Sequence, residues 1–286
     1  MRNGSLTIER EEALLDLIDD PSPWVRTQLI DEFIRMGPQG FDFLNTIAKR
    51  PNRLLSWHAR WFLSELDKDN PISEFIKFIQ SERYELESGS LRIANRSLAT
   101  GDVCKSLDQI AFRCRQLLIE PASPRDKLLV INRILFHEME FRGNREDYTN
   151  PKNSFLPEIL KQKTGLPISL SILYILVAGR LGLDLEGVAI PGHFIVGCYE
   201  TPQALFIDPF DSGKLWTGEE LLQNNGTIGF ITDPSVLVPT TIREILCRSC
   251  RNLVSHYNQA GQADFAQTFQ RFVSEFQTVD RNHNGF

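Results

Sequence analysis

Apolar residues recur at intervals of three and four along most of the first 180 residues of the chain. The segments WVRTQLIDEFIRM, WHARWFLSEL and LDQIAFRCRQLL all show this spacing, which gathers apolar side chains on one face of an α-helix. Residues 142–154, RGNREDYTNPKNS, interrupt the pattern with Gly, Asn, Asp and Pro and predict a loop. The pattern therefore predicts a largely helical chain with one long functional or disordered loop.

The hydrophobic pattern changes after residue 165. The segment LPISLSILYILVAGRLGL is apolar on nearly every side, which predicts a buried helix from Pro167 to Gly182. LEGVAI, HFIVGCYE and ALFIDPF are short and rich in β-branched and aromatic residues, so they predict strands, with a turn at 201–203. Helical spacing then returns on both sides of Gly261. A buried helix followed by antiparallel strands predicts an α+β fold.

These patterns divide the chain into four parts. We expect a helical N-terminal domain over 1–88, an α+β domain over 89–238 and a C-terminal helical pair over 239–277. The polar residues 278–286 predict a mobile tail.

Two arginines in the N-terminal domain indicate an internal repeat. Arg26 and Arg60 lie 34 residues apart in similar surroundings. The segment resembles HEAT-type repeats, whose second helices often begin with an Asp-Pro turn and a Val-Arg pair, as Asp20, Pro21, Val25 and Arg26 do here. A plain helical bundle explains the same spacing, and both interpretations predict a helical surface without chemistry.

Charge and hydropathy restrict the partners. The chain has 31 Lys and Arg against 37 Asp and Glu, a formal charge of −6, which provides no general attraction to nucleic acid or anionic lipid. No stretch approaches the roughly 18 apolar residues of a membrane span, and the N-terminal residues lack the apolar centre of a signal peptide. We therefore expect a cytoplasmic protein that binds neither nucleic acid nor membranes.

The five cysteines predict neither a metal site nor a cofactor. Cys247 and Cys250 form one C-x-x-C pair, but no second pair stands at zinc spacing. In a cytoplasmic protein the thiols are expected to be reduced. We interpret the pair as two thiols on a helix.

A histidine and an aspartate on neighbouring predicted strands are the main candidates for chemistry. Cys198 faces the opposite side of its strand from His193 and lies about 17 Å along it, so it is not the thiol that His193 would activate. If the chain turns near 201, Asp208 comes opposite residues 193–197, and both side chains share a face if the loop has an even length or contains a bulge. Such a carboxylate would orient the imidazole, as in a nucleophilic triad. Alternatively, His193 lies at the edge of a core and Asp208 forms a turn bond.

Four motifs in order carry a family resemblance: GNREDYTNPKNSFLPEIL, GLPISLSILYILVAGRLGL, IPGHFIVG and FIDPFDSGKLWTGEEL. Together they resemble the SirB-type transglutaminase-like family, a branch of the transglutaminase and papain-like superfamily, from about Leu91 to Leu222. The resemblance implies a helix packed on an antiparallel sheet, with His193 and Asp208 at the family's His and Asp positions. Active members begin the buried helix with a cysteine in a G-x-C pattern, and here Pro167 stands in that place.

The resemblance also indicates further site residues. Ser169 is the nearest substitute for the missing thiol as a nucleophile, although it equally suits a capping bond at the helix start. Tyr148 and Asn153 match polar positions of the family and, with Pro167 and Gly192, are candidates to line the same cleft. Asn153 alternatively caps the next helix, and Gly192 alternatively permits an unusual turn.

Two functions follow from these observations, besides that of a purely structural scaffold. The first is a non-classical transglutaminase-like module that keeps the cleft and the His-Asp pair but binds a protein segment, peptide or small ligand in a regulatory role. The alternative is a hydrolase or acyltransferase that uses Ser169, His193 and Asp208, or uses His193 as a general base for water.

Overall fold

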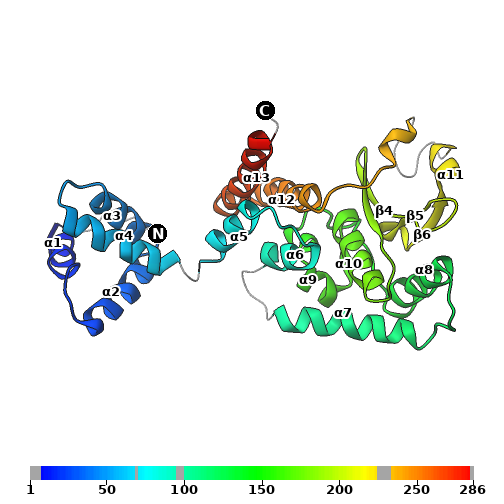
Figure 1. Ribbon diagram of the computed structural model, residues 1–286, viewed down its shortest axis with the longest axis horizontal. Helices are drawn as coiled ribbons and strands as arrows, with labels where there is room; N and C mark the ends of the chain where they lie inside the picture. The colour runs from blue at the N-terminus through cyan, green and yellow to red at the C-terminus, as the bar shows by residue number, and fades with distance from the viewer. Residues whose placement is uncertain (1–7, 68–69, 95–99, 224–232, 284–286) are drawn as a thin grey trace. The chain divides into compact units, whose positions relative to one another are not determined.

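The computed structural model describes residues 8–67, 70–94, 100–223 and 233–283. The chain forms two compact units, residues 1–74 and 75–286, which divide within helix α5 (Pro71–Gln80). Figure 1 shows the helical first unit and the second unit, which contains the sheet. The domain boundaries expected at 88, 238 and 277 stay predictions.

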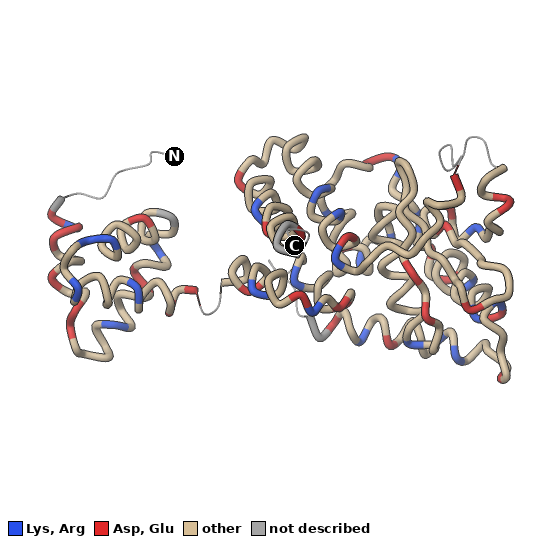
Figure 2. Tube along the Cα trace, turned by 45° about the horizontal axis from the view of Figure 1, so that its top comes forward, with Lys and Arg blue, Asp and Glu red and all other residues tan. Residues whose placement is uncertain are grey.

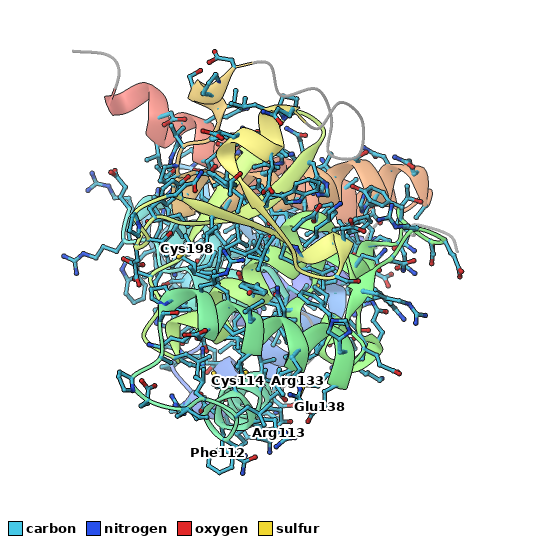
Figure 3. All side chains as sticks on the ribbon, turned by 90° about the vertical axis from the view of Figure 1, so that its right-hand side faces the viewer. Phe112, Arg113, Cys114, Arg133, Glu138 and Cys198 are labelled. Atoms are coloured by element: carbon cyan, nitrogen blue, oxygen red, sulfur yellow. The ribbon has the colours of Figure 1, made fainter. Side chains whose placement is uncertain are left out.

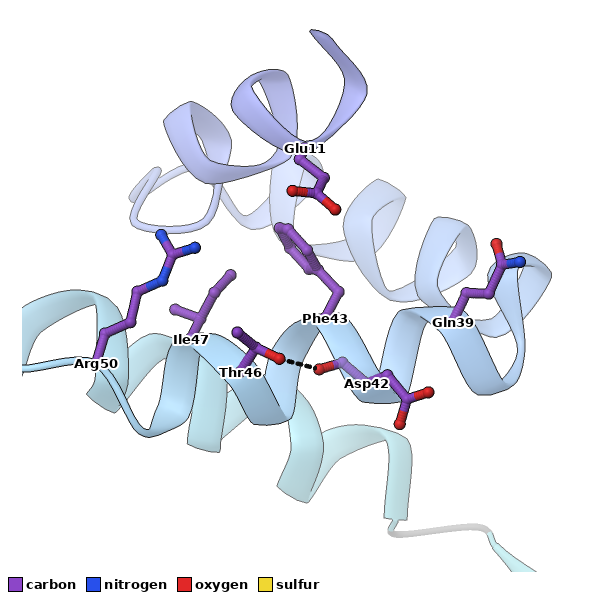
Figure 4. A pocket seen from close by; sticks show the side chains of 7 residues that line it. All are labelled: Glu11, Gln39, Asp42, Phe43, Thr46, Ile47 and Arg50. Atoms are coloured by element: carbon purple, nitrogen blue, oxygen red, sulfur yellow. Dashed lines mark hydrogen bonds between the residues drawn. The ribbon is translucent and has the colours of Figure 1, made fainter. Parts of the chain in front are cut away.

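The first unit is helical, with prolines at the first turns of two helices, where a missing N–H costs no hydrogen bond. Its helices are α1 (Ile8–Leu17), α2 (Pro23–Met36), α3 (Pro38–Ala48) and α4 (Arg53–Asp67). Phe33 is fully buried and meets the ring edge of Phe62 with centroids 5.4 Å apart. A cavity of about 250 Å³ lies beside Phe43 and is flanked by Glu11 and Arg50 (Figure 4).

The two arginines that indicated a repeat have similar contacts. Arg26 donates to the carbonyl oxygen of Asp20 at 3.2 Å, in the turn before its own helix. Arg60 donates to the carbonyl oxygen of Ala48 at 3.3 Å, at the end of the helix before its own. Each arginine therefore ties its helix to the preceding backbone, while the HEAT-type repeat itself stays a prediction.

The second unit surrounds a small sheet with helices. The helices before the sheet are α6 (Leu86–Ala94), α7 (Thr100–Arg115), α8 (Pro124–Asn132), the π-helix η1 (Arg133–Glu138), the 3-10 helix η2 (Pro151–Ser154), α9 (Leu156–Gln162) and α10 (Pro167–Gly179). The helices that follow the first sheet strands are η3 (Pro209–Asp211), α11 (Gly218–Gln223), η4 (Pro234–Val236), α12 (Ile242–Gln259) and α13 (Ala263–His283). Arg113 donates to both carboxylate oxygens of Glu138, at 2.6 and 3.1 Å, and so joins α7 to the end of η1 (Figure 3).

The main sheet is antiparallel, with its strands in chain order. Its members are β3 (Glu186–Ile190), β4 (His193–Cys198), β5 (Leu205–Asp208) and β6 (Lys214–Thr217). A separate two-stranded parallel sheet joins β1 (Arg142–Gly143) to β2 (Thr164–Gly165). The buried helix α10 packs against β3 and β4, as Figure 1 shows, which confirms the α+β fold class.

The sequence predicted β3, β4, β5 and the buried helix, but not the other strands. The strands β1 and β2 were not predicted, since two residues carry no periodicity, and β6 was not predicted although it is as long as β5. The expected loop 142–154 was partly wrong, because it contains β1 and η2. Helix α10 ends at Gly179, not at the predicted Gly182, since Gly182 has a φ of 68° and Leu183 N–H returns to the carbonyl of Ala178.

The C-terminal helical pair forms as the spacing around Gly261 predicted. Gly261 adopts a φ of 69° in the turn, and Tyr257 of α12 stacks on Phe265 and Phe269 of α13 at 5.0 and 5.7 Å. Helix α13 continues to His283, so the tail expected to begin at 278 is helical up to that residue. Residues 284–286 of that tail lie outside the described residues.

Acidic and basic residues are interspersed along the elements of both units (Figure 2). In the described part of the chain, none of the helices combines the length and the apolar character needed to cross a bilayer.

Candidate functional site

His193 and Asp208 form a direct hydrogen bond, with Nε2 and Oδ2 2.9 Å apart. The register of β4 and β5 explains the contact, because Cys198 pairs with Leu205 and leaves a connecting loop of six residues, an even number. Continued by one step, this register sets Asp208 opposite Ile195, so His193 is its diagonal neighbour on the same face. The predicted geometry of the pair is therefore present.

The carboxylate of Asp208 divides its two oxygens between two tasks. Oδ1 accepts hydrogen bonds from the N–H groups of Phe210 and Asp211, at 3.0 and 3.3 Å, and so caps η3. Oδ2 is left for His193. The Asp208 side chain is only 3% exposed. The predicted pair with His193 and the alternative turn bond therefore both occur at this one buried carboxylate.

The bond to Asp208 assigns the tautomer of His193. An ionised carboxylate only accepts hydrogen bonds, so Nε2 carries the proton and Nδ1 keeps a lone pair in the neutral ring. The His193 side chain is 15% exposed, so part of the imidazole is open to solvent. The ring can thus accept a hydrogen bond or a proton at Nδ1.

An aromatic cluster surrounds the pair: His193, Phe210, Tyr148 and His256. The Phe210 ring meets His193 and Tyr148 edge to face, with centroids 5.8 and 6.1 Å apart. Tyr148, 42% exposed, also meets the His256 ring at 6.2 Å. The Phe210 ring therefore stands between Tyr148 and His193, and a role of Tyr148 in the site stays a prediction.

Helix α12 contributes two side chains here: His256, which belongs to the cluster, and Arg248, which lies beside it. Arg248 donates to the backbone oxygen of His193 at 3.0 Å, and burial lowers the pKa of its guanidinium. Among the described residues Arg248 has no ion-pair partner. His256 is buried, which lowers the pKa of its imidazole, and its Nδ1 has no hydrogen-bond partner in the described part of the chain. Burial likewise raises the pKa of Tyr148.

Ser169 takes part in the hydrogen bonds of the helix start. Its Oγ accepts a hydrogen bond from the N–H of Leu166 at 2.9 Å. Its single proton faces the backbone oxygen of Asn153 at 2.6 Å, with the carbonyl of Leu166 at 3.2 Å. The residue is 3% exposed and performs the capping role given as the alternative, while its role as a nucleophile stays a prediction.

Pro167 occupies the first turn of α10 and is buried. The five cysteines are free, and all lie elsewhere in the fold. Burial raises the pKa of Cys198, and raises that of Cys114 and Cys247 to about 11, so these thiols stay protonated at neutral pH. Within the described residues, no group of three or more His, Cys, Asp or Glu side chains is arranged to hold a metal ion.

Asn153 organises the loop that presents Tyr148. Its side-chain nitrogen donates to the backbone oxygens of Asp147 and Tyr148, at 2.6 and 3.2 Å, and its oxygen accepts from Asn144 and Gln162. The residue at the N-cap of α9, the helix that follows, is Phe155, so Asn153 is not the cap of that helix. Gly192 has a φ of 72° and a Cβ added there would meet nothing within 4 Å, so the turn conformation accounts for this glycine.

A buried polar chain holds the turn behind Asp208. The side-chain nitrogen of Asn132 donates to the carbonyl of Gly213 at 2.7 Å, and its oxygen accepts from the hydroxyl of Tyr174 at 2.9 Å. The N–H of Gly213 in turn donates to the carbonyl of Asp208 at 2.8 Å. Asn132 therefore links α8 and α10 to the turn that carries the aspartate.

Sequence reasoning missed Phe210, Arg248, His256 and Asn132 as residues of the site or its support. Arg248 and His256 are eight residues apart, which sets them on one face of α12, two turns apart. The spacing could have been recognised in the sequence, but the neighbouring residues do not indicate which element this face of α12 packs against.

Comparison with known proteins identifies the superfamily of the chain. A family model described as the transglutaminase-like superfamily matches residues 101–251, so the chain belongs to that superfamily. A UPF0162 protein of Xylella fastidiosa (strain 9a5c) is 37% identical over 146 residues, 49% of this chain and 52% of the relative. A UPF0162 protein of Pseudomonas aeruginosa is 28% identical over 162 residues, 55% of this chain and 58% of the relative.

The same region is similar to part of a longer protein. F-box only protein 21 of Mus musculus is 31% identical over 170 residues, which cover 54% of this chain and 27% of that protein. The matches thus cover between 27% and 58% of the length of these relatives. No solved structure is significantly similar to the chain.

Proposed function

We propose that this chain is a non-classical transglutaminase-like module that binds a protein segment or peptide beside His193 and does not perform acyl transfer. The observation that carries the proposal is the identity of the residue at the start of α10. Pro167 has no nucleophilic atom, whereas active members of the superfamily begin this helix with a thiol. The His-Asp pair is retained without the group that it would activate.

Ser169 does not readily replace the thiol. An alcohol needs a general base within hydrogen-bond reach, since its own proton is held far more tightly than that of a thiol. The Ser169 proton is directed to the carbonyl of Asn153, and no hydrogen bond joins its Oγ to His193 within the described structure. These bonds favour a role for Ser169 in holding the helix start.

The groups beside His193 suit recognition of a polar backbone or an anionic side chain. Nδ1 of His193 offers an acceptor, while Tyr148 and Arg248 offer donors that lack a charged partner in the described chain. Tyr and Arg are also the side chains that most often contribute strongly to protein interfaces. A similar segment makes up 27% of F-box only protein 21, which supports the interpretation of this region as a module that occurs in different proteins.

A hydrolase is the second candidate, favoured by the bond between His193 and Asp208. A histidine that is oriented by a carboxylate, is 15% exposed, and whose Nδ1 makes no hydrogen bond within the described residues is equipped to take a proton from water. In this alternative either water or Ser169 would attack a carbonyl carbon.

Paired variants in the full chain test the proposal. Tagged wild-type protein, His193→Ala and the control His137→Ala, which removes an exposed imidazole on η1, are used to capture partners from the same lysate. We expect a partner that wild type and His137→Ala retain equally and that His193→Ala loses. A partner retained equally by all three would contradict binding at His193.

A second measurement separates the enzyme from the binding module. Intact mass spectrometry after treatment with a fluorophosphonate, and hydrolysis of a p-nitrophenyl ester, report on a reactive serine and on general-base catalysis respectively. We expect no adduct at Ser169 and no hydrolysis that depends on His193. An adduct absent from Ser169→Ala, or hydrolysis lost in His193→Ala alone, would establish the hydrolase instead.

A further inference from the structure

The outer side of α4 carries exposed arginines that have no acidic partner in the described part of the chain. Arg53, Trp57 and Arg60 are exposed at positions i, i+4 and i+7, so they form one row along the helix. We call this row the basic face. Neither arginine forms an ion pair among the described residues, and Arg60 donates to the carbonyl oxygen of Ala48 at 3.3 Å. Residues 43–64 contain four Lys and Arg and no Asp or Glu.

Large apolar side chains are exposed on the same helix. Trp57, between the two arginines, and Leu54 beside it are each 56% exposed. Tryptophan and arginine are the side chains that most often dominate protein interfaces. A partner that supplies carboxylates and also covers Trp57 would therefore satisfy both the charge and the apolar area of the basic face.

The outer side of α1 carries the opposite charge. Glu9, Ala13 and Asp16 are exposed, and they also stand at positions i, i+4 and i+7. We call this row the acidic face. Neither Glu9 nor Asp16 forms an ion pair within the described residues, because Arg10, the one basic residue of α1, pairs with Glu32.

The acidic face and the basic face match in spacing. Seven residues of helix rise about 10.5 Å, so the two carboxylate residues are as far apart along α1 as the two arginines are along α4. Ala13 stands between the carboxylates at the position that Trp57 has between the arginines, and its small side chain leaves room for the indole ring. Leu17, one residue beyond the acidic face, is 42% exposed and provides a further apolar contact.

We propose that the acidic face of α1 in one copy of this chain binds the basic face of α4 in a second copy. Both faces are exposed within the same compact unit, so they do not satisfy each other inside one copy. The net charge of −6 makes two copies repel at long range, so their association depends on these two opposed faces. The proposal does not rest on the function of His193.

The association is expected to be weak and sensitive to salt. A contact between two helix faces is small, as in transient interfaces below about 1,200 Å², and its ion pairs are open to solvent. Sedimentation equilibrium of the full chain at several concentrations measures it. We expect wild type to self-associate at low ionic strength and to dissociate in about 1 M NaCl, where the screening length falls to about 3 Å.

Charge reversal identifies the two faces. In Arg53→Glu/Arg60→Glu both faces are acidic, and in Glu9→Arg/Asp16→Arg both are basic. We expect each variant alone to self-associate at least about tenfold more weakly than wild type. An equimolar mixture of the two should regain the wild-type association, because every acidic face then has a basic face on the other variant.

Two further variants separate the faces from general effects. Trp57→Ala should weaken self-association by about fivefold, since it removes the exposed ring and leaves the charges in place. The matched control Arg125→Glu/Arg271→Glu reverses two exposed arginines on α8 and α13, and so changes the net charge by the same amount as reversal of the basic face. It should associate within about twofold of wild type.

Several outcomes would overturn the proposal. They are a wild-type chain that is monomeric at every concentration, reversed variants that associate as wild type, and a mixture that stays monomeric. A monomeric wild type whose basic face captures a separate acidic protein would assign that face to another partner. If Arg53→Glu/Arg60→Glu loses its folded circular dichroism spectrum, Arg53→Glu replaces it, since that variant keeps the bond from Arg60 to Ala48.

Discussion

The Ser169 hydroxyl donates a hydrogen bond of 2.6 Å to the backbone oxygen of Asn153, and so ties the start of α10 to the loop that carries Tyr148. The same oxygen atom accepts the N–H of Leu166, which has no partner inside the helix. Both bonds lie in the first turn of α10, two residues after Pro167. The relationship makes the role of Ser169 measurable through stability as well as activity.

We predict that Ser169→Ala lowers the free energy of unfolding by about 1–3 kcal/mol, because it removes the two short bonds that Ser169 Oγ makes with Leu166 N–H and with the Asn153 oxygen. These two buried groups then keep only their long bond of 3.4 Å to each other. Ser171→Ala, two residues further along α10, is the matched control. The Ser171 Oγ is buried without a partner in the described structure, so its removal should be neutral or stabilising. Urea unfolding measures both, and equal destabilisation by the two variants would contradict the capping role.

We predict that Asp208→Asn changes the tautomer of His193 while the fold persists. The amide oxygen must still accept the N–H groups of Phe210 and Asp211, so the amide nitrogen is turned toward His193. Nε2 then becomes an acceptor and the ring proton moves to Nδ1. Long-range nitrogen–proton NMR correlation of the imidazole reports this change. The control Asp211→Asn should keep the wild-type tautomer of His193. A wild-type spectrum for Asp208→Asn would contradict the tautomer assigned to His193.

We predict that Gly213→Ala destabilises the chain by more than Gly182→Ala. Both glycines have positive φ, 73° and 68°, so each alanine costs roughly 1–2 kcal/mol of backbone strain. At Gly213 the new Cβ would also come within 2.4 Å of the Asn132 side-chain oxygen, whereas nothing lies within 4 Å at Gly182. The difference between the two losses in free energy of unfolding measures the packing of Gly213 against Asn132, behind Asp208. Equal losses would show that the Asn132 side chain moves aside at no energetic cost.

We predict that His256 makes the protein less stable in mild acid. Burial lowers the pKa of its imidazole below the ordinary 6.5, so between the folded and unfolded pKa values the unfolded chain binds more protons. The stability that depends on neutral His256 is therefore complete above pH 6.5 and falls as the pH drops below it. Urea unfolding at pH 7.5 and 5.5 should show a smaller loss for His256→Gln than for wild type.

The exposed His137 provides the control for that experiment. His137→Gln should lose as much stability as wild type between the two pH values, because its side chain is already solvated in the folded state. A loss in His256→Gln as large as that in wild type would mean that other groups account for the pH dependence.

We predict that native protein at pH 7.5 reacts slowly with iodoacetamide, and at Cys104 alone. Four of the thiols are buried, while Cys104 is half-buried and its hydrogen bond to Glu87 raises its pKa. Intact mass spectrometry should show at most one adduct on the folded chain and five after unfolding, with none on folded Cys104→Ser. Rapid modification of Cys247 or Cys250 would contradict the buried C-x-x-C pair.

Much of the site was predictable because it depends on short-range geometry. The alternation of side chains on β4 excluded Cys198 as the thiol that His193 would activate. An even loop length was the condition for His193 and Asp208 to share a face of the sheet. The six-residue connection meets that condition. The short strand β6 and the π-helix η1 were missed because their local patterns do not differ from those of a loop and an ordinary helix.

The sequence by itself determined the helix and strand periods and the absence of a cysteine at Pro167, and it set the condition of loop length under which His193 pairs with Asp208, since each depends on residues that are neighbours along the chain or across one hairpin. Only the tertiary structure decided which groups surround that pair. Arg248 reaches His193 from a helix some fifty residues away, His256 of the same helix meets Tyr148, and Ser169 is directed to Asn153 across a loop. Such contacts depend on how whole elements pack, which local spacing does not specify.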